Sequence, residues 1–230
     1  TGALLWTRQF GTAGYDQATW VAITSDGHVV VSGYVTGTLP GETGTGGIDS
    51  FAMAFDADGA LLWQDQHGTA ATEFGVSIAT DAAGNAYFLG RTQGTYPMAT
   101  SAGSNDVIVR AYDADGAVLY TTQFGTSGID DSMSISAAPD GRVFAVGVTQ
   151  GTFSGEISAG GADAFLAELD VDGALVGVRQ FGSAGTDVAR DVAFDPRGKI
   201  YLVGNAGAEF AGQTPSGPSD IFVMSLLPSP

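Results

Sequence analysis

The sequence contains no cysteine and only one lysine, Lys199. Without cysteine, neither a disulfide framework nor a thiolate metal site can form. One lysine and seven arginines stand against 25 acidic residues, which gives a net charge of −17. Binding of nucleic acid or of an anionic membrane needs clustered positive charge. We therefore expect no nucleic-acid partner.

The chain also lacks long apolar runs, since the longest are about six residues, far below the length that spans a bilayer. We therefore expect no direct membrane insertion. No initiator methionine or signal-peptide pattern is present, so we expect a mature form or an excised domain. The composition is rich in Gly, Thr, Ser and Ala and poor in Lys, which favours an exported bacterial protein, secreted or displayed at the cell surface.

An internal repeat organises the whole chain. Adding 57 to a residue number maps the sequence onto itself without a gap, and such self-similarity is the signature of a repeat architecture. The aligned columns include Gln9, Gln66, Gln123 and Gln180; Gly33, Gly90, Gly147 and Gly204; and Asp49, Asp106, Asp163 and Asp220. Four units of this length account for nearly all of the 230 residues.

Each unit predicts four short strands. In the first unit these are residues 18–24, 29–35, 50–55 and 61–66, which are apolar or β-branched runs bounded by Asp-Gly and Gly-rich turns. No apolar pattern recurs at helical spacing over a useful length. We therefore expect an all-β protein with almost no helix. Radial repetition of a four-stranded antiparallel unit into a propeller protects the sheet edges.

The unit also resembles the bacterial β-propeller repeat called SBBP. The resemblance rests on FG followed by an acid in RQFGTAGYDQA, a DxxGN-like turn in TDAAGNAYFLGRT, the aromatic-Pro pair in TYP, and GGxDxF in GGADAFLAELD. It covers all four units and implies a propeller without any particular activity. The first turn, SDGH, and the fourth loop, AEFA, depart from the pattern.

The two ends of the chain suggest how such a ring would close. LLWTRQ near the start has the sequence of a fourth strand, while the last unit provides only three strands before SLLPSP. We expect a single closed four-bladed β-propeller in which strand 4–10 joins blade 4. The expected blades are about 17–67, 74–124, 131–181 and 188–227. The alternatives are four blades of a longer array, or two chains pairing into a larger ring.

Two columns of acidic residues are expected on the edge that carries the long loops. One column precedes the first strands and comprises Asp16, Glu73, Asp130 and Asp187; the other begins at Asp49. In a closed propeller the first strands would line a narrow central channel. Four carboxylates at its mouth would suit Ca²⁺, which prefers six to eight oxygen ligands. The first column therefore predicts a Ca²⁺ site. In the competing interpretation, each acid accepts backbone N–H bonds in an Asx turn.

Other motifs carry little functional signal. The DADG and DVDG turns lack the later ligands of an EF-hand loop, so we interpret them as hairpin turns. His67 occupies the column of Phe10, Phe124 and Phe181, which predicts that it packs as an aromatic side chain. No GxSxG motif is present, and fourfold repetition of the acids favours a structural role over catalysis.

The positions that break the repeat are the better functional candidates. After the Gly33 column stand Tyr34, Arg91, Val148 and Asn205. Trp20 is the aromatic member of a column that otherwise reads Ser77, Ser134 and Asp191, and Tyr96 lies in the long loop with Leu39, Phe153 and Phe210 in its column. We predict that Trp20, Tyr34, Arg91, Tyr96 and Asn205 bind a carbohydrate or a protein or peptide ligand. We expect a monomeric, non-enzymatic binding module. The alternatives are a glycan hydrolase or lyase that uses rim carboxylates, and a purely structural scaffold.

Overall fold

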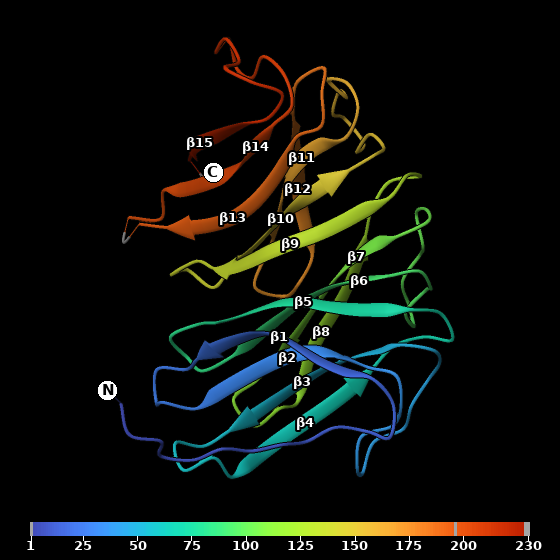
Figure 1. Ribbon diagram of the computed structural model, residues 1–230, viewed down its shortest axis with the longest axis vertical. Coiled ribbons are helices and arrows are strands. Elements are labelled where there is room, and N and C mark those ends of the chain that lie inside the picture. Colours follow the sequence, from blue (N-terminus) through green and yellow to red (C-terminus); the bar gives the residue numbers. More distant parts are fainter. Residues whose placement is uncertain (1, 196, 228–230) are drawn as a thin grey trace.

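The computed structural model describes residues 2–195 and 197–227, and every regular element in these residues is a β-strand (Figure 1). The strands are β1 (Asp16–Ile23), β2 (Val29–Val35), β3 (Asp49–Phe55), β4 (Leu61–His67), β5 (Glu73–Thr80), β6 (Ala86–Thr92), β7 (Asp106–Tyr112), β8 (Val118–Phe124), β9 (Asp130–Ala137), β10 (Val143–Thr149), β11 (Asp163–Leu169), β12 (Leu175–Phe181), β13 (Val188–Phe194), β14 (Ile200–Ala206) and β15 (Asp220–Leu226). The all-β class is confirmed. Among the described residues, no helix is long and apolar enough to cross a membrane.

The strands form four antiparallel meanders, which we call blades 1 to 4: β1–β4, β5–β8, β9–β12 and β13–β15. Short turns close the hairpins at one edge of each blade. The turn glycines, such as Gly59 with φ of 77°, take the left-handed conformation that favours glycine. The long loops lie at the opposite edge, because β1 begins and β2 ends there. This arrangement of antiparallel sheets is consistent with a propeller-like fold.

Every first strand contains the same bulge. In blade 1, Ala18 pairs with Gly33 and Trp20 pairs with Ser32, so that Thr19 is the extra residue. The irregularity recurs at the equivalent positions of β5, β9 and β13. A bulge increases local twist. The 57-residue period of the sequence therefore corresponds to a repeated backbone geometry and not only to a repeated composition.

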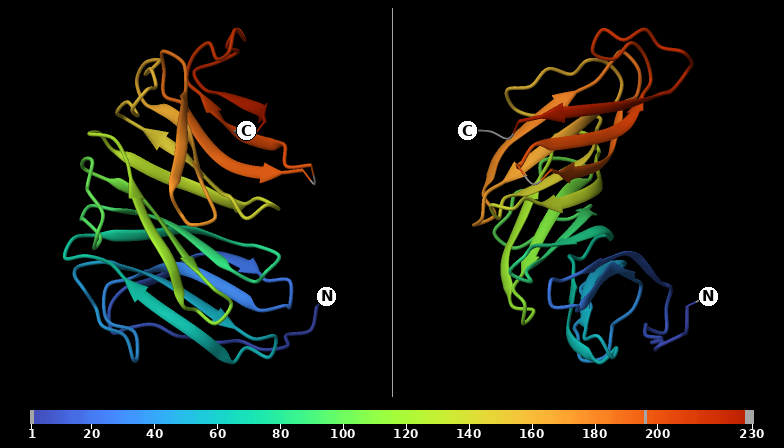
Figure 2. Two further views of the ribbon diagram at one scale, coloured as in Figure 1. Left: turned by 180° about the vertical axis from the view of Figure 1, so that it is seen from behind. Right: turned by 90° about the vertical axis from the view of Figure 1, so that its left-hand side faces the viewer.

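The blades stack face to face in chain order. Their first strands contact one another in the series β1, β5, β9 and β13, and Figure 2 shows the blades following one another along the long axis. Apolar side chains fill the three spaces between blades. Phe88 and Tyr112 lie between blades 1 and 2, and Phe165 lies between blades 2 and 3. Burial of one such side chain contributes about 1.5 to 3 kcal/mol.

The structure does not show the four blades closing into a ring. Blades 1 and 4 lie at opposite ends of the long axis (Figure 1), and the sheet of blade 4 has three strands in the described residues. Residues 4–10 form no strand. They lie along blade 1, where the indole N–H of Trp6 donates to Ala57 O at 2.8 Å. Their predicted pairing with blade 4 is therefore absent from this arrangement.

Residues 4–10 nevertheless occupy the place of a fourth strand from a preceding blade. Arg8 Nε donates to Gly59 O at 2.7 Å. The equivalent residue in β8, Thr122, donates to Gly173 O on the next blade at 2.6 Å. The same edge-to-face ring contact also recurs, in the pairs Phe10–Phe51, Phe124–Phe165 and Phe181–Phe222. The segment therefore contacts blade 1 as a fourth strand contacts the blade after it.

Candidate binding surface on the long-loop edge

A row of aromatic and charged side chains crosses the long-loop edge of blades 1 to 3. We call it the aromatic–arginine row; its members are Tyr15, Tyr34, Phe74, Arg91 and Asp131. The Tyr34 ring lies 6.4 Å from that of Tyr15 and meets Phe74 edge to face at 4.9 Å. The Arg91 guanidinium lies 4.9 Å from the centre of the Phe74 ring, and its Nη1 is 2.6 Å from Asp131 Oδ1. The row is continuous across three blades.

The row is held in place by its own polar contacts. The hydroxyls of Tyr15 and Tyr34 both donate to Gln17 Oε1, at 3.0 and 2.7 Å. The Arg91 and Asp131 side chains keep 34% and 27% of their surface exposed. An ion pair this exposed contributes at most about 1 kcal/mol. Arg91 can therefore exchange its partner for an anionic group of a ligand at little energetic cost.

The predicted binding residues lie in four separate places. Tyr34 and Arg91 come together through Phe74. Trp20 is half exposed on β1, and Asn205 accepts a hydrogen bond from Arg190 Nε at 3.2 Å on blade 4. Tyr96 is buried between blades 1 and 2, away from this surface.

Sequence reasoning missed four residues of this surface: Tyr15, Gln17, Phe74 and Asp131. A signal for three of them existed. Their column reads Gln17, Phe74, Asp131 and Val188, which breaks the repeat as strongly as the Tyr34 column does. The two columns are cross-strand neighbours, since Gln17 pairs with Tyr34 and Phe74 pairs with Arg91. Variation in these two paired columns would have identified every member of the row except Tyr15.

The acidic column predicted to bind Ca²⁺ makes local turn bonds. Each carboxylate accepts the backbone N–H of the residue four positions earlier: Thr12 N to Asp16, Thr69 N to Glu73, Thr126 N to Asp130 and Ser183 N to Asp187. The hydroxyls of the same four residues also donate to these carboxylates. These are the bonds of the competing turn interpretation.

The second acidic column makes the same kind of bond, as in Thr45 N to Asp49 Oδ2 at 2.9 Å. Burial raises the pKa of Asp130, and the nearby charge of Asp106 acts in the same direction. In residues 2–195 and 197–227, no group of three or more acidic or histidine side chains is arranged to hold a metal ion. The Ca²⁺ site stays a prediction.

His67 lies in the interior between blades 1 and 2. Its Nδ1 is 2.8 Å from the hydroxyl of Tyr96, and its ring meets Phe88 edge to face at 4.7 Å. Burial lowers the pKa of His67 to about 3, and the positive charge of Arg110 adds to the shift. His67 is therefore neutral near pH 7 and cannot reach a ligand on the long-loop edge. It packs as the sequence predicts for its column.

Replacing His67 by phenylalanine should make the free energy of unfolding depend less strongly on pH in the acidic range. The folded state keeps His67 neutral down to about pH 3, whereas the unfolded chain protonates it near pH 6.5. The stabilisation that comes from keeping His67 neutral is fully present above about pH 6.5. Below that pH the unfolded chain takes up the proton, and the free energy of unfolding falls by about 1.4 kcal/mol for each pH unit. Urea unfolding between pH 7 and pH 4 measures the slope, which should be shallower in His67→Phe. The control His28→Asn, which keeps His67, should have the same slope as wild type. Equal slopes in wild type and His67→Phe would contradict this account.

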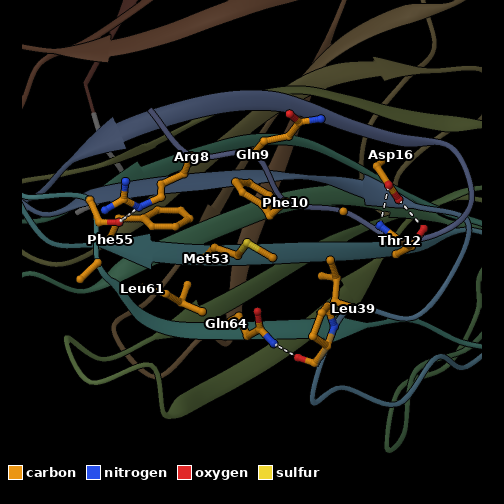
Figure 3. Close-up of a pocket in the computed structure, with 14 residues that line it drawn as sticks. Arg8, Gln9, Phe10, Thr12, Asp16, Leu39, Met53, Phe55, Leu61 and Gln64 are labelled. Carbon is orange, nitrogen blue, oxygen red and sulfur yellow. Dashed lines mark hydrogen bonds between the residues drawn. The ribbon is translucent and has the colours of Figure 1, made fainter. Parts of the chain in front are cut away.

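A cavity of about 830 Å³ lies apart from the row, on the outward face of blade 1. Figure 3 shows Phe10 beside Arg8 and Phe55, with Met53 and Leu61 below them in the view. The lining is largely apolar. The cavity belongs to the face against which residues 4–10 pack.

Comparisons with known proteins give no family. No family model and no curated protein match the sequence, so membership of the SBBP family stays a prediction. Among solved structures, a luciferin-regenerating enzyme matches with 11% identity and a TM-score of 0.43, over 82% of this chain and 54% of that one. An aldose sugar dehydrogenase from Streptomyces coelicolor, solved with PQQ bound, matches with 15% identity and a TM-score of 0.42, over 85% and 58%. This chain thus spans little more than half of either, and such distant likenesses carry no argument about its function.

Proposed function

We propose that this chain is a non-catalytic binding module whose ligand lies across the aromatic–arginine row. The observation that supports the proposal is the continuity of the row, in which Phe74 contacts both Tyr34 and Arg91 although the three residues come from two blades. Half-exposed aromatic rings beside a weakly paired arginine are the usual components of polar ligand sites.

The chemistry of the row favours a carbohydrate or peptide ligand. The exposed ring of Tyr15 and the neighbouring ring of Tyr34 offer stacking surfaces to the apolar face of a sugar or to an aromatic side chain. Arg91 offers a planar set of donors to a carboxylate. An acidic sugar or a peptide with an aromatic residue next to an acid would use both features. Acid–base catalysis has less support, because the repeated carboxylates of this edge are engaged in turn bonds.

Three further expectations remain proposals. A secreted or surface location has only the composition as support. Ca²⁺ at the Asp16 column is tested by calorimetric titration of chelated protein. The closed four-bladed ring of a single chain would require blades 1 and 4, which lie at opposite ends of the molecule (Figure 1), to meet, and it is the alternative to an association between two copies.

Replacing Arg91 by alanine should weaken ligand binding by about tenfold or more, because the variant loses the charged anchor, worth about 1.4 kcal/mol. Wild-type protein is first screened on glycan and peptide arrays, and the affinity for the strongest ligand is then measured by calorimetry. Arg197→Ala, in an exposed turn on the opposite edge, is the matched control and should bind as wild type does. A complete absence of ligands, or equal affinity of Arg91→Ala and wild type, would contradict the proposal.

A further inference from the structure

The outward face of blade 4 is an uncovered copy of an interior surface. Ile221 and Val223 on β15 are 82% and 73% exposed, and Tyr201 and Val203 on β14 are also exposed. The equivalent residues of the preceding two blades are buried against the next blade: Tyr87, Leu89, Val107 and Val109 in blade 2, and Phe144, Val146, Ala164 and Leu166 in blade 3. Blade 4 therefore presents the surface with which the earlier blades pack onto their successors.

Blade 1 presents the complementary surface. Val21 is 57% exposed, whereas its equivalents Ile78, Ile135 and Val192 are buried against the preceding blade. The 830 Å³ cavity lies on the same face. The outward faces of blades 1 and 4 are thus the two halves of the interface that occurs three times inside the chain.

A side-chain clamp is also divided between the two ends. In each complete blade, a glutamine of the fourth strand links the long loop to the aspartate that begins the third strand. Gln66 Oε1 accepts from Leu39 N at 2.7 Å, and its Nε2 donates to Asp49 Oδ2 at 2.7 Å. Gln123 makes the same two bonds in blade 2, as does Gln180 in blade 3.

Blade 4 contains the receiving groups of this clamp but not the glutamine. The equivalent groups are Phe210 N and Asp220 Oδ2, and a cavity of about 620 Å³ lies between Phe210, Asp220 and Phe222. The fourth glutamine of the column is Gln9. It is exposed on the segment along blade 1, and within the described part of the chain its side chain makes no hydrogen bond.

We propose that this chain associates head to tail with a second copy of itself. Blade 4 of one copy packs on blade 1 of the next, and residues 4–10 of the second copy become the fourth strand beside β15. Transfer of the register of β3 and β4 places Phe10 opposite Ile221 and Arg8 opposite Val223. Gln9 then reaches Phe210 N and Asp220 Oδ2. A second copy fits because blades 1 and 4 of a single copy lie at opposite ends of the molecule (Figure 1).

The association buries the exposed faces and completes the sheet edge in one step. A free edge strand with apolar side chains is otherwise a site of uncontrolled pairing. Head-to-tail contacts use two different surfaces, so they close into a ring when the rotation permits and extend into a filament when it does not. In this proposal, an assembly of two or more copies takes the place of the monomer that the sequence predicts.

Engineered cysteines test this pairing directly, since the chain has none of its own. In the double variant Arg8→Cys/Val223→Cys, the two thiols should meet across neighbouring copies and form an intermolecular disulfide under mild oxidation. Mixing the two single variants should likewise give a disulfide-linked heterodimer on a non-reducing gel. Leu166→Cys/Arg179→Cys is the matched control: its residues occupy the same columns and pair within blade 3, so its disulfide should form inside one chain.

The outcomes separate the three ways in which the ends could be completed. Intermolecular disulfides support the second copy. An intramolecular Arg8→Cys/Val223→Cys disulfide would mean that one chain closes on itself and would overturn the proposal. No disulfide, with the control forming normally, would assign the faces to a different blade and would also overturn it.

Light scattering provides a second readout that needs no oxidation. Wild-type protein should have a mass of two or more chains, and Val223→Asp should reduce it to one chain, because a charge on this face cannot be buried without a partner. Ile157→Asp, on an exposed loop residue, should leave the mass unchanged. A single-chain mass for wild type at micromolar concentration would overturn the proposal.

Discussion

Replacing Gly147 by alanine is expected to destabilise the fold by about 3 kcal/mol, the upper part of the range for overpacked interiors. A β-carbon at this position would lie 2.1 Å from the backbone oxygen of Asp131 and 2.7 Å from the Phe165 ring. The backbone oxygen belongs to the bulged strand β9 and cannot move without disturbing the bulge. The same close approach occurs at Gly33 and Gly204, which explains why this glycine column is invariant along the repeat.

Chemical denaturation of Gly147→Ala and of Gly177→Ala measures this effect against a matched control. Gly177 lies on the outer strand β12, and a β-carbon there meets no atom within 4 Å. Gly177→Ala should be neutral or slightly stabilising, because alanine restricts the unfolded chain more than glycine does. Similar stabilities for the two variants would show that the column is not sterically constrained.

Replacing Asp65 by asparagine should destabilise the protein by about 2 to 3 kcal/mol. Arg110 Nε lies 2.9 Å from Asp65 Oδ2, and the hydroxyl of Tyr112 donates to the same oxygen at 2.8 Å. The two charged side chains are 18% and 21% exposed. Loss of one partner leaves Arg110 largely buried without a counter-charge, which usually costs about 3 to 5 kcal/mol when burial is complete. Equilibrium unfolding in urea at pH 7 measures the loss.

Two further variants test whether the unpaired charge of Arg110 causes the destabilisation of Asp65→Asn. Asp140→Asn breaks the pair with Arg142, in which Asp140 is 53% exposed, and should cost less than about 1 kcal/mol. The double variant Asp65→Leu/Arg110→Met should recover most of the stability, because methionine already occupies the Arg110 column at Met53 and Met224. A double variant as unstable as Asp65→Asn would show that charge pairing is not the cause.

The ion pair between Asp65 and Arg110 should also make the free energy of unfolding fall at low pH. Burial alone would raise the pKa of Asp65, but the His67 imidazole, the Arg110 guanidinium and the Tyr112 hydroxyl together outweigh it and lower the pKa below its ordinary value. A carboxyl group with a lowered folded pKa stabilises the protein above its unfolded pKa of about 3.9. That stability is lost as the pH falls through the folded value. This loss lies at lower pH than the onset expected for His67.

The strands and their order followed from local sequence. Asp-Gly turns and short apolar runs define hairpins, and the gapless period fixed four units before any contact was known. Closure did not follow, because it depends on the angle between successive blades. That angle is set by bulges such as the one at Thr19 and by the packing of large side chains such as Phe88. Neither is readable from a repeat length.

Only part of the candidate surface could be predicted, because the sequence does not show which columns lie side by side in the fold. Tyr34 and Arg91 stand out because they differ from each other in an aligned column, but the ring that joins them, Phe74, belongs to a different column on the neighbouring strand. Tyr96 shares an aromatic column with Phe153 and Phe210, and it faces the adjacent blade. The sequence alone does not distinguish an inter-blade position from a solvent position when both are aromatic.

The central claim, that ligand lies across the aromatic–arginine row, is tested most directly by mapping amide chemical-shift changes during titration with the strongest array ligand. The account predicts the largest changes at Tyr34, Phe74 and Arg91, and none at the short turns of the opposite edge. Changes concentrated at the short turns, or around Met53 and Phe55 in the blade 1 cavity, would contradict it.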